Sequence, residues 1–171
     1  GVQLVVRSSL NDHEGTIVKE ETSVERMLIS GVAADKNVAK IRVAGLGNDP
    51  ESTFRLLNLL DRNNLNIDVM IQSLGKDGTK SVSFTVAKPD MLRTIDVLND
   101  NKDSLGIKKL DYDENVAKIS VIGAGVRSHS GVAAKMFGAL ANAGINTEMI
   151  TTSEIRITAL IDEAYADQAM R

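Results

Sequence analysis

Two stretches of the sequence decide the fold: residues 35–47 read DKNVAKIRVAGLG, and residues 113–125 read DENVAKISVIGAG. Nine of these 13 positions are identical at an offset of 78 residues. The likeness continues downstream, where LNIDVMIQS at 65–73 matches INTEMITTS at 145–153. Such a repeat, in a chain without low-complexity segments, indicates two copies of one structural unit.

The first copy predicts the element order β-α-β-β-α-β. Apolar and polar residues alternate at 40–45, which is typical of a strand. Asp49-Pro50 then begins a helix, because aspartate favours the N-cap and proline the first helical position. Two strands, a second helix and a last strand follow. Their predicted ranges are 65–71, 82–86, 89–100 (with Leu92, Ile95 and Leu98 buried) and 107–112.

The second copy repeats this order up to its second helix, with elements at 116–122, 131–143, 145–152, 155–161 and from 162 onward. Its last strand is missing, and Val2–Arg7 is an extra strand at the other end of the chain. We expect this strand to complete the second sheet, which would make the first copy an insertion in the second. The predicted domains are 28–112 for the first unit, and 1–27 with 113–171 for the second.

A β-α-β-β-α-β unit is the ferredoxin-like arrangement. The sequence therefore predicts an α+β fold of two such units, each an antiparallel sheet with helices on one face. The edge strands of such sheets have unpaired backbone groups that can bond to another chain, so we expect a homodimer. Hydrophobic residues make up 43% of the chain but aromatic residues only 3%, so the core must be aliphatic.

Composition also narrows the function. The net charge of −3 comes without clustered basic residues, which argues against nucleic-acid binding. The absence of cysteine excludes thiolate nucleophiles and cysteine-based metal sites. No apolar run reaches the roughly 20 residues that span a bilayer. We expect no membrane association and a cytoplasmic location.

Several motifs occur in the order found in one known family: VRSS at 6–9 with GTI at 15–17, ISGVA at 29–33, NID at 66–68 with Gln72, and ITTSEI at 150–155. SHSGV at 128–132 is similar to that family's second effector loop. The chain closely resembles the C-terminal regulatory region of aspartate kinase, which carries tandem ACT domains. The resemblance covers nearly the whole chain.

The resemblance implies an allosteric module rather than a self-sufficient enzyme. End-product amino acids, threonine or lysine, would bind at ACT–ACT interfaces and inhibit phosphorylation of L-aspartate. The family's catalytic lobe has no match in this sequence, so ATP and Mg²⁺ are expected in that lobe and no catalytic residue, metal ligand or cofactor in this chain. We expect either an excised fragment or a separately made regulatory subunit, partnered by a kinase catalytic domain or subunit; the truncated last helix favours a fragment.

The expected effector sites follow from the charges of a free amino acid. Its carboxylate suits the N–H groups at a helix N-terminus, and each copy offers one, at 46–53 and 126–133. Its ammonium group needs carboxylates, which stand at equivalent points of the two copies. By resemblance, Asn146 and Thr147 close the site from the partner half. The predicted effector-binding residues are Leu46, Asn48, Pro50, Glu51, Ser52, Thr53, Asp68, Gln72, Val126, Ser128, His129, Gly131, Val132, Asn146, Thr147, Glu148, Ser153 and Glu154.

The nature of the effector stays open. A lysine effector needs an acidic group for its side chain, for which Asp68, Glu148 and Glu154 are candidates. A threonine effector needs an amide or a hydroxyl, for which Gln72 and Asn146 are candidates.

Other interpretations remain beside this one. The family's first loop usually reads Asp-x-Pro-Gly, whereas residues 48–51 here read NDPE, and glycine is the residue that lets backbone approach a ligand closely. A module that only holds kinase subunits together therefore stays possible. An independent enzyme is disfavoured, because the sequence shows no nucleophile–base pair, metal cluster or phosphate loop. Gly123-Ala124-Gly125 is a poor dinucleotide fingerprint, because Ser128 stands where its third glycine is required.

Overall fold

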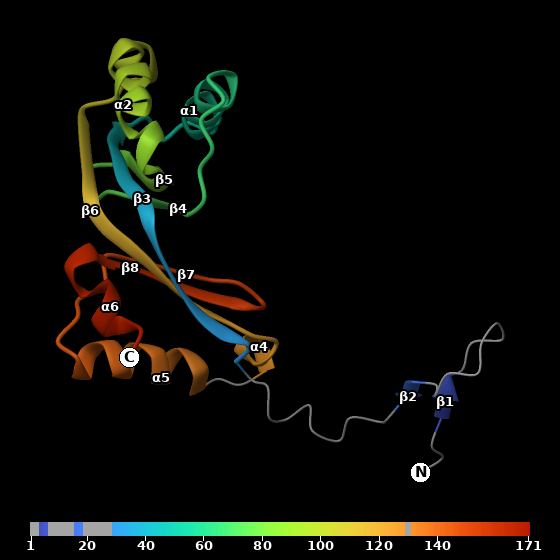
Figure 1. Ribbon diagram of the computed structural model, residues 1–171. Helices are drawn as coiled ribbons and strands as arrows, with labels where there is room; N and C mark the ends of the chain where they lie inside the picture. The colour runs from blue at the N-terminus through green and yellow to red at the C-terminus, as the bar shows by residue number, and fades with distance from the viewer. Residues whose placement is uncertain (1–3, 7–15, 19–28, 129–130) are drawn as a thin grey trace.

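The computed structural model describes residues 4–6, 16–18, 29–128 and 131–171. Two lobes share one antiparallel six-stranded sheet with the strand order β4-β5-β3-β6-β8-β7 (Figure 1). The strands of this sheet are β3 (Gly31–Leu46), β4 (Met70–Leu74), β5 (Lys80–Ala87), β6 (Lys109–Ile122), β7 (Met149–Thr152) and β8 (Arg156–Asp162).

The helices fall into two groups, one for each lobe (Figure 1). The first lobe holds α1 (Glu51–Arg62), the 3-10 helix η2 (Lys88–Asp90), α2 (Met91–Asp100) and α3 (Lys102–Leu105). The second lobe holds α4 (Gly125–Ser128), α5 (Gly131–Asn142), the 3-10 helix η3 (Glu163–Tyr165) and α6 (Ala166–Ala169). The predicted α+β fold of two ferredoxin-like units is confirmed.

An apolar and largely aliphatic core lies between the helices and the sheet in each lobe. Ile41, Leu56 and Phe84 are fully buried in the first core, and Ile119, Leu140 and Ile161 lie in the second. The buried face of α2 is formed by Met91, Thr94, Ile95 and Leu98, which follow the helical i, i+3, i+4, i+7 spacing. The expectation that Leu92 is buried was wrong: it falls outside this stripe and is 67% exposed.

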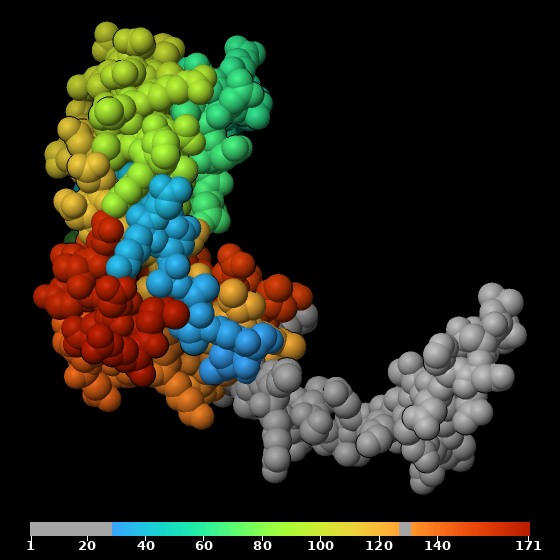
Figure 2. Space-filling model, viewed as in Figure 1, coloured from blue at the N-terminus to red at the C-terminus, as the bar shows by residue number. Residues whose placement is uncertain are grey.

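The two longest strands, β3 and β6, belong to both lobes. The first part of β3, Gly31–Asp35, pairs with Lys118–Ile122 of β6 in the second lobe. The later part of β3 pairs with β5 and with the beginning of β6 in the first lobe. Figure 2 shows β3 running from one lobe into the other. The lobes are therefore joined by continuous backbone pairing.

The duplicated motif forms the crossing point of these strands. The pairing register between β3 and β6 shifts twice. The first shift lies between Asp35 and Val38 of β3, and the second lies between Asp113 and Val116 of β6. At each place an aspartate side chain accepts a hydrogen bond from the backbone N–H two residues later, at 2.9 Å: Asp35 from Asn37, and Asp113 from Asn115. These local bonds stabilise the bulged backbone at the point where each strand passes from one lobe to the other.

The expectation for Val2–Arg7 needs correction. Within this segment, β1 (Leu4–Val6) pairs with β2 (Thr16–Val18) in a separate two-stranded sheet. The strand that completes the second lobe's part of the sheet is instead Gly31–Asp35, which pairs with Lys118–Ile122 of β6. The reason is that β3 continues through the bulge instead of beginning after it. The boundary at residue 28 moves accordingly to the bulge, and the rest of 1–27 lies outside the described residues.

A third apolar cluster fills the junction between the lobes, on the sheet face opposite the helices. It contains Val38, Val69, Val116, Met149 and Leu160, with Ile71 packed against it. Its members come from both repeats at matching positions: Val38 corresponds to Val116, and Val69 to Met149. The junction therefore has approximate twofold symmetry.

Candidate functional site

The first predicted loop folds onto the beginning of α1. The Asp49 carboxylate accepts hydrogen bonds from the Glu51 N–H at 3.0 Å and from the Ser52 hydroxyl. The Ser52 bond is the main reason that the pKa of Asp49 is lowered. The Lys80 ammonium donates to the Asp49 carbonyl at 2.7 Å. This aspartate therefore already occupies part of the helix N-terminus.

The structure brings Gln72 of β4 to the same loop. The Thr53 hydroxyl donates to Gln72 Oε1 at 2.6 Å, which joins the first turn of α1 to the sheet. Leu46 and Ser52 are buried, so they shape the loop from inside. The other predicted residues of the loop, Asn48, Pro50 and Glu51, are exposed.

The second loop is described only in part. His129 and the side chain of Ser128 lie outside the described residues. Gly131 begins α5, and a Cβ atom added there would meet nothing within 4 Å. Two predicted residues of this loop belong to the core of the second lobe: Val132 is buried in it, and Val126 packs against it.

The remaining predictions for the second unit are spread over two places. Asn146 and Thr147 line a hollow beyond the C-terminal end of α5, about 18 Å along the helix from Gly131. Ser153 and Glu154 lie in the turn between β7 and β8, where the Ser153 N–H donates to the Arg156 carbonyl at 2.7 Å. Within one chain, the structure does not bring Asn146 and Thr147 to the second loop.

The two carboxylates proposed for the effector's ammonium group lie at the junction between the lobes. Lys118 pairs with Asp68, and Lys40 pairs with Glu148. Asp68 is four residues from Gln72, about 13 Å along an extended chain. The predicted residues of the first unit therefore fall into two groups, one at the α1 loop and one at the junction.

These ion pairs follow the approximate twofold symmetry. Lys40 and Lys118 occupy the same position of the duplicated motif, and each reaches the carboxylate of the other lobe. A further pair, Lys88 with Glu163 at 2.6 Å, joins the beginnings of η2 and η3. The two motif lysines were not predicted as part of the site. The signal that could have identified them is that both copies carry a lysine at this position.

A polar cleft of about 280 Å³ opens beside the Lys118–Asp68 pair. One wall comes from residues 68–70 of the first lobe, and the other from β6, β7 and β8 of the second lobe. Its polar side chains include Asp68, Lys118, Thr151, Ser153, Arg156 and Thr158. Arg156 and Thr158 were not predicted, because they lie on a strand without a motif.

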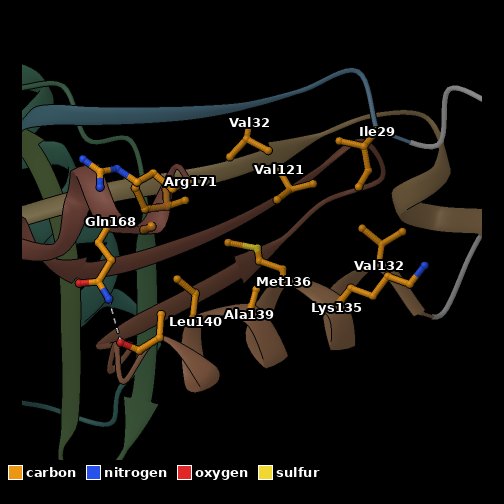
Figure 3. Close-up of a pocket in the computed structure, with 13 residues that line it drawn as sticks. Ile29, Val32, Val121, Val132, Lys135, Met136, Ala139, Leu140, Gln168 and Arg171 are labelled. Carbon is orange, nitrogen blue, oxygen red and sulfur yellow. Dashed lines mark hydrogen bonds between the residues drawn. The ribbon is translucent and has the colours of Figure 1, made fainter.

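A second hollow, of about 350 Å³, lies between α5, α6 and the sheet (Figure 3). Its lining is apolar, with Lys135, Gln168 and Arg171 as the polar exceptions. The Gln168 amide already donates to the Ala143 carbonyl at 3.1 Å. Among the described residues that line this hollow, none is an aspartate or a glutamate, so it does not suit the ammonium group of an amino acid.

The described part of the chain holds no group of three or more histidine, cysteine, aspartate or glutamate residues arranged for a metal ion. None of its helices combines the length and the apolar character needed to cross a membrane.

The chain is similar to the ACT domain family and to aspartokinases. The ACT domain family matches residues 119–171. Aspartokinase from Pseudomonas aeruginosa is 36% identical over 173 residues, covering 99% of this chain and 42% of that protein. Aspartokinase from Helicobacter pylori is 41% identical over 176 residues, covering 99% and 43% respectively. The chain thus spans about two fifths of the length of these curated relatives.

Two solved structures match this chain over most of their own length. A crystal structure of aspartokinase alpha and beta subunits has 43% sequence identity and a TM-score of 0.78, covering 84% of this chain and 94% of that one. The ligand-free regulatory subunit of aspartate kinase from Thermus thermophilus has 32% identity and a TM-score of 0.79, covering 84% and 95%. The chain therefore belongs to the aspartokinase family, as a regulatory region of the ACT-domain type.

Proposed function

We propose that the chain senses end-product amino acids, threonine or lysine, and passes that signal to an aspartate kinase catalytic domain or subunit, inhibiting phosphorylation of L-aspartate. The family supports this role, since a relative that matches most of the chain is a regulatory subunit of aspartate kinase. ATP and Mg²⁺ would bind in the catalytic part of that enzyme. This chain would contribute regulation and no reacting group.

The observation that carries the proposal is the bridge between Thr53 and Gln72. It places a hydroxyl and an amide beside the beginning of α1, where helix N–H groups and the helix dipole favour a carboxylate. An amino acid can bind its carboxylate to those N–H groups and exchange hydrogen bonds with the Thr53–Gln72 pair. Gly131 leaves more room at the equivalent helix of the second unit.

A homodimer forms part of the proposal, because the six-stranded sheet has two open edges. They are β4 and β7, which carry the exposed apolar residues Leu74 and Ile150. An edge strand with apolar side chains and unpaired backbone groups is suited to pairing with another chain. In a dimer, Asn146 and Thr147 beside β7 would approach a loop of the partner.

The second candidate is a module that holds kinase subunits together without sensing. The observation in its favour is the Asp49 carboxylate, which already bonds the first turn of α1. Glu51 adds a second negative charge at the same loop. Both charges oppose a ligand carboxylate at this helix.

A thermal-shift panel of the twenty amino acids separates the two candidates. Sensing predicts a rise in Tm with threonine or lysine, and dimerisation alone predicts none. The variant Gln72→Ala should reduce the rise, whereas Gln168→Ala, an equal change on α6, should leave it intact. A dimer whose Tm responds to no amino acid would reject sensing and support the second candidate.

A further inference from the structure

We propose that the polar cleft at the junction is a second amino-acid site, distinct from the helix loops, in which Lys118 is a built-in competitor of the ligand. The ligand's ammonium group takes the place of Lys118 on Asp68, and its carboxylate binds Arg156. The proposal rests on the amino-acid sensing proposed above, and it adds a location and a mechanism of coupling between the lobes.

The cleft carries the two charges that a zwitterion requires. Asp68 projects from the first lobe and Arg156 from the second, and both line the same 280 Å³ space. Among the residues that the structure describes, none forms an ion pair with the Arg156 guanidinium. Guanidinium groups bind carboxylates through paired hydrogen bonds. Hydroxyl groups of Thr151 and Ser153 add neutral hydrogen-bonding partners.

An ammonium group already occupies the acidic side of this cleft. Lys118 Nζ pairs with Asp68 and lies 3.3 Å from Asp35 Oδ2. The lysine side chain is only 14% exposed, whereas that of Asp68 is 52% exposed. Solvent and a ligand can therefore reach the carboxylate. The lysine is held in place by the fold, so a free ammonium group must compete with it for Asp68.

The approximate twofold symmetry relates this cleft to the surroundings of Lys40, where Arg156 has no counterpart to bind a carboxylate. There Lys40 pairs with Glu148 in the same manner. The pairing of β4 with β5, and of β7 with β8, aligns Arg156 with Ser81 and Thr151 with Ile71. Duplication has thus kept the ion pair in both places, and one place alone carries the arginine. The two lysines make a matched pair for experiment.

Ligand binding in this cleft would change the contact between the lobes. The Lys118–Asp68 pair crosses from one lobe to the other, and its loss leaves the Lys40–Glu148 pair in place. The relative orientation of the two lobes would then depend on whether the ligand is bound. A ligand shifts such an equilibrium through its different affinities for the two arrangements. The cleft thus gives sensing a route to the subunit arrangement.

Titration calorimetry of the full chain with L-threonine and L-lysine tests the proposal. Lys118→Met should tighten binding about tenfold, within the range of ordinary coupling between sites. Lys40→Met is the matched control and should leave the affinity unchanged. Arg156→Gln should weaken binding about tenfold or more. The N-acetyl and amide derivatives of each amino acid should bind poorly, since each lacks one charge. Circular dichroism and urea midpoints establish that each variant is folded.

The outcomes distinguish this proposal from the sensing function. Binding that Gln72→Ala abolishes, and that Lys118→Met and Arg156→Gln leave unchanged, would overturn the cleft site while sensing stands. Equal effects of Lys118→Met and Lys40→Met would also overturn it, because the arginine would then confer nothing. Folded protein that binds neither amino acid, in the wild type and in Lys118→Met, would reject both sensing and the cleft.

Discussion

Thr85 holds the beginning of β4 through its hydroxyl group, and replacement by valine tests that contact. The residue is fully buried. Its Oγ1 accepts a hydrogen bond from the Val69 N–H at 3.1 Å. The backbone of Thr85 bonds the Asp68 N–H and the Val69 carbonyl, so the hydroxyl is the acceptor that the structure gives to the Val69 N–H. Valine has a similar shape and cannot accept this bond.

The expected cost follows from that buried N–H group. A buried donor without a partner costs about 1–3 kcal/mol. The methyl group that replaces the hydroxyl returns up to about 0.8 kcal/mol by burial. We expect Thr85→Val to lower the free energy of unfolding by about 1–2 kcal/mol. With a urea m-value of roughly 2 kcal/mol/M, the midpoint falls by about 0.5–1 M.

Urea unfolding followed by circular dichroism measures this shift. Thr94→Val is the matched control, because Thr94 is equally buried but its hydroxyl donates to the Asp90 carbonyl one helical turn earlier. That carbonyl can still accept its helix bond, so we expect a change within about 0.5 kcal/mol. A Thr85→Val midpoint no lower than that of Thr94→Val would refute the reasoning.

Three further predictions concern the two crossing strands. A double-mutant cycle of Lys40→Met and Glu148→Gln, measured by urea unfolding, should give a coupling of about 0.5–1 kcal/mol, since both side chains are partly exposed; zero coupling would mean that the pair does not join the lobes. Asp113→Ala should lower the free energy of unfolding by about 0.5–1 kcal/mol, because the bulge in β6 loses its side-chain bond; an unchanged urea midpoint would contradict this. The pKa of Asp167 is lowered from its ordinary value of 3.8, first by the hydrogen bond from Lys36. Its contribution to stability is therefore complete above that ordinary value and is lost as the pH falls through the lowered pKa, and Lys36→Met should remove this part of the acid dependence of Tm.

Much of the fold could be predicted from the sequence because its signals are local. The repeat revealed two units, and side-chain alternation and helical spacing revealed their elements. The extent of β3 could not be predicted in this way. Its first part, Gly31–Asp35, is stabilised by pairing with Lys118–Ile122, nearly 90 residues later. Such a distant partner leaves no mark on local periodicity, and the strand was therefore predicted from Val2–Arg7 instead.

The site was predicted less completely, for a related reason. Equivalent placement of Asp68 and Glu148 in the two copies led to their prediction as effector ligands, and the structure shows each of them in an ion pair. The sequence could not show that a lysine from the other lobe reaches each one. That contact depends on the shared sheet, which places Val69 and Met149, the residues next to these carboxylates, in the junction cluster. The proximity of Thr53 and Gln72 was easier to predict, because both residues belong to one unit.

The motif that revealed the repeat also explains why the two units should act together. In DKNVAKI and DENVAKI, the aspartate bonds the bulge, the valine enters the junction core, and the lysine two residues after the valine reaches the carboxylate of the other lobe. One short segment thus sets strand crossing, packing and charge pairing at once. Because β3 and β6 each run through both lobes, a rotation at the junction must bend both strands. A ligand that displaces one lysine therefore acts on the whole sheet, and a flexible linker between two closed domains could not transmit that change.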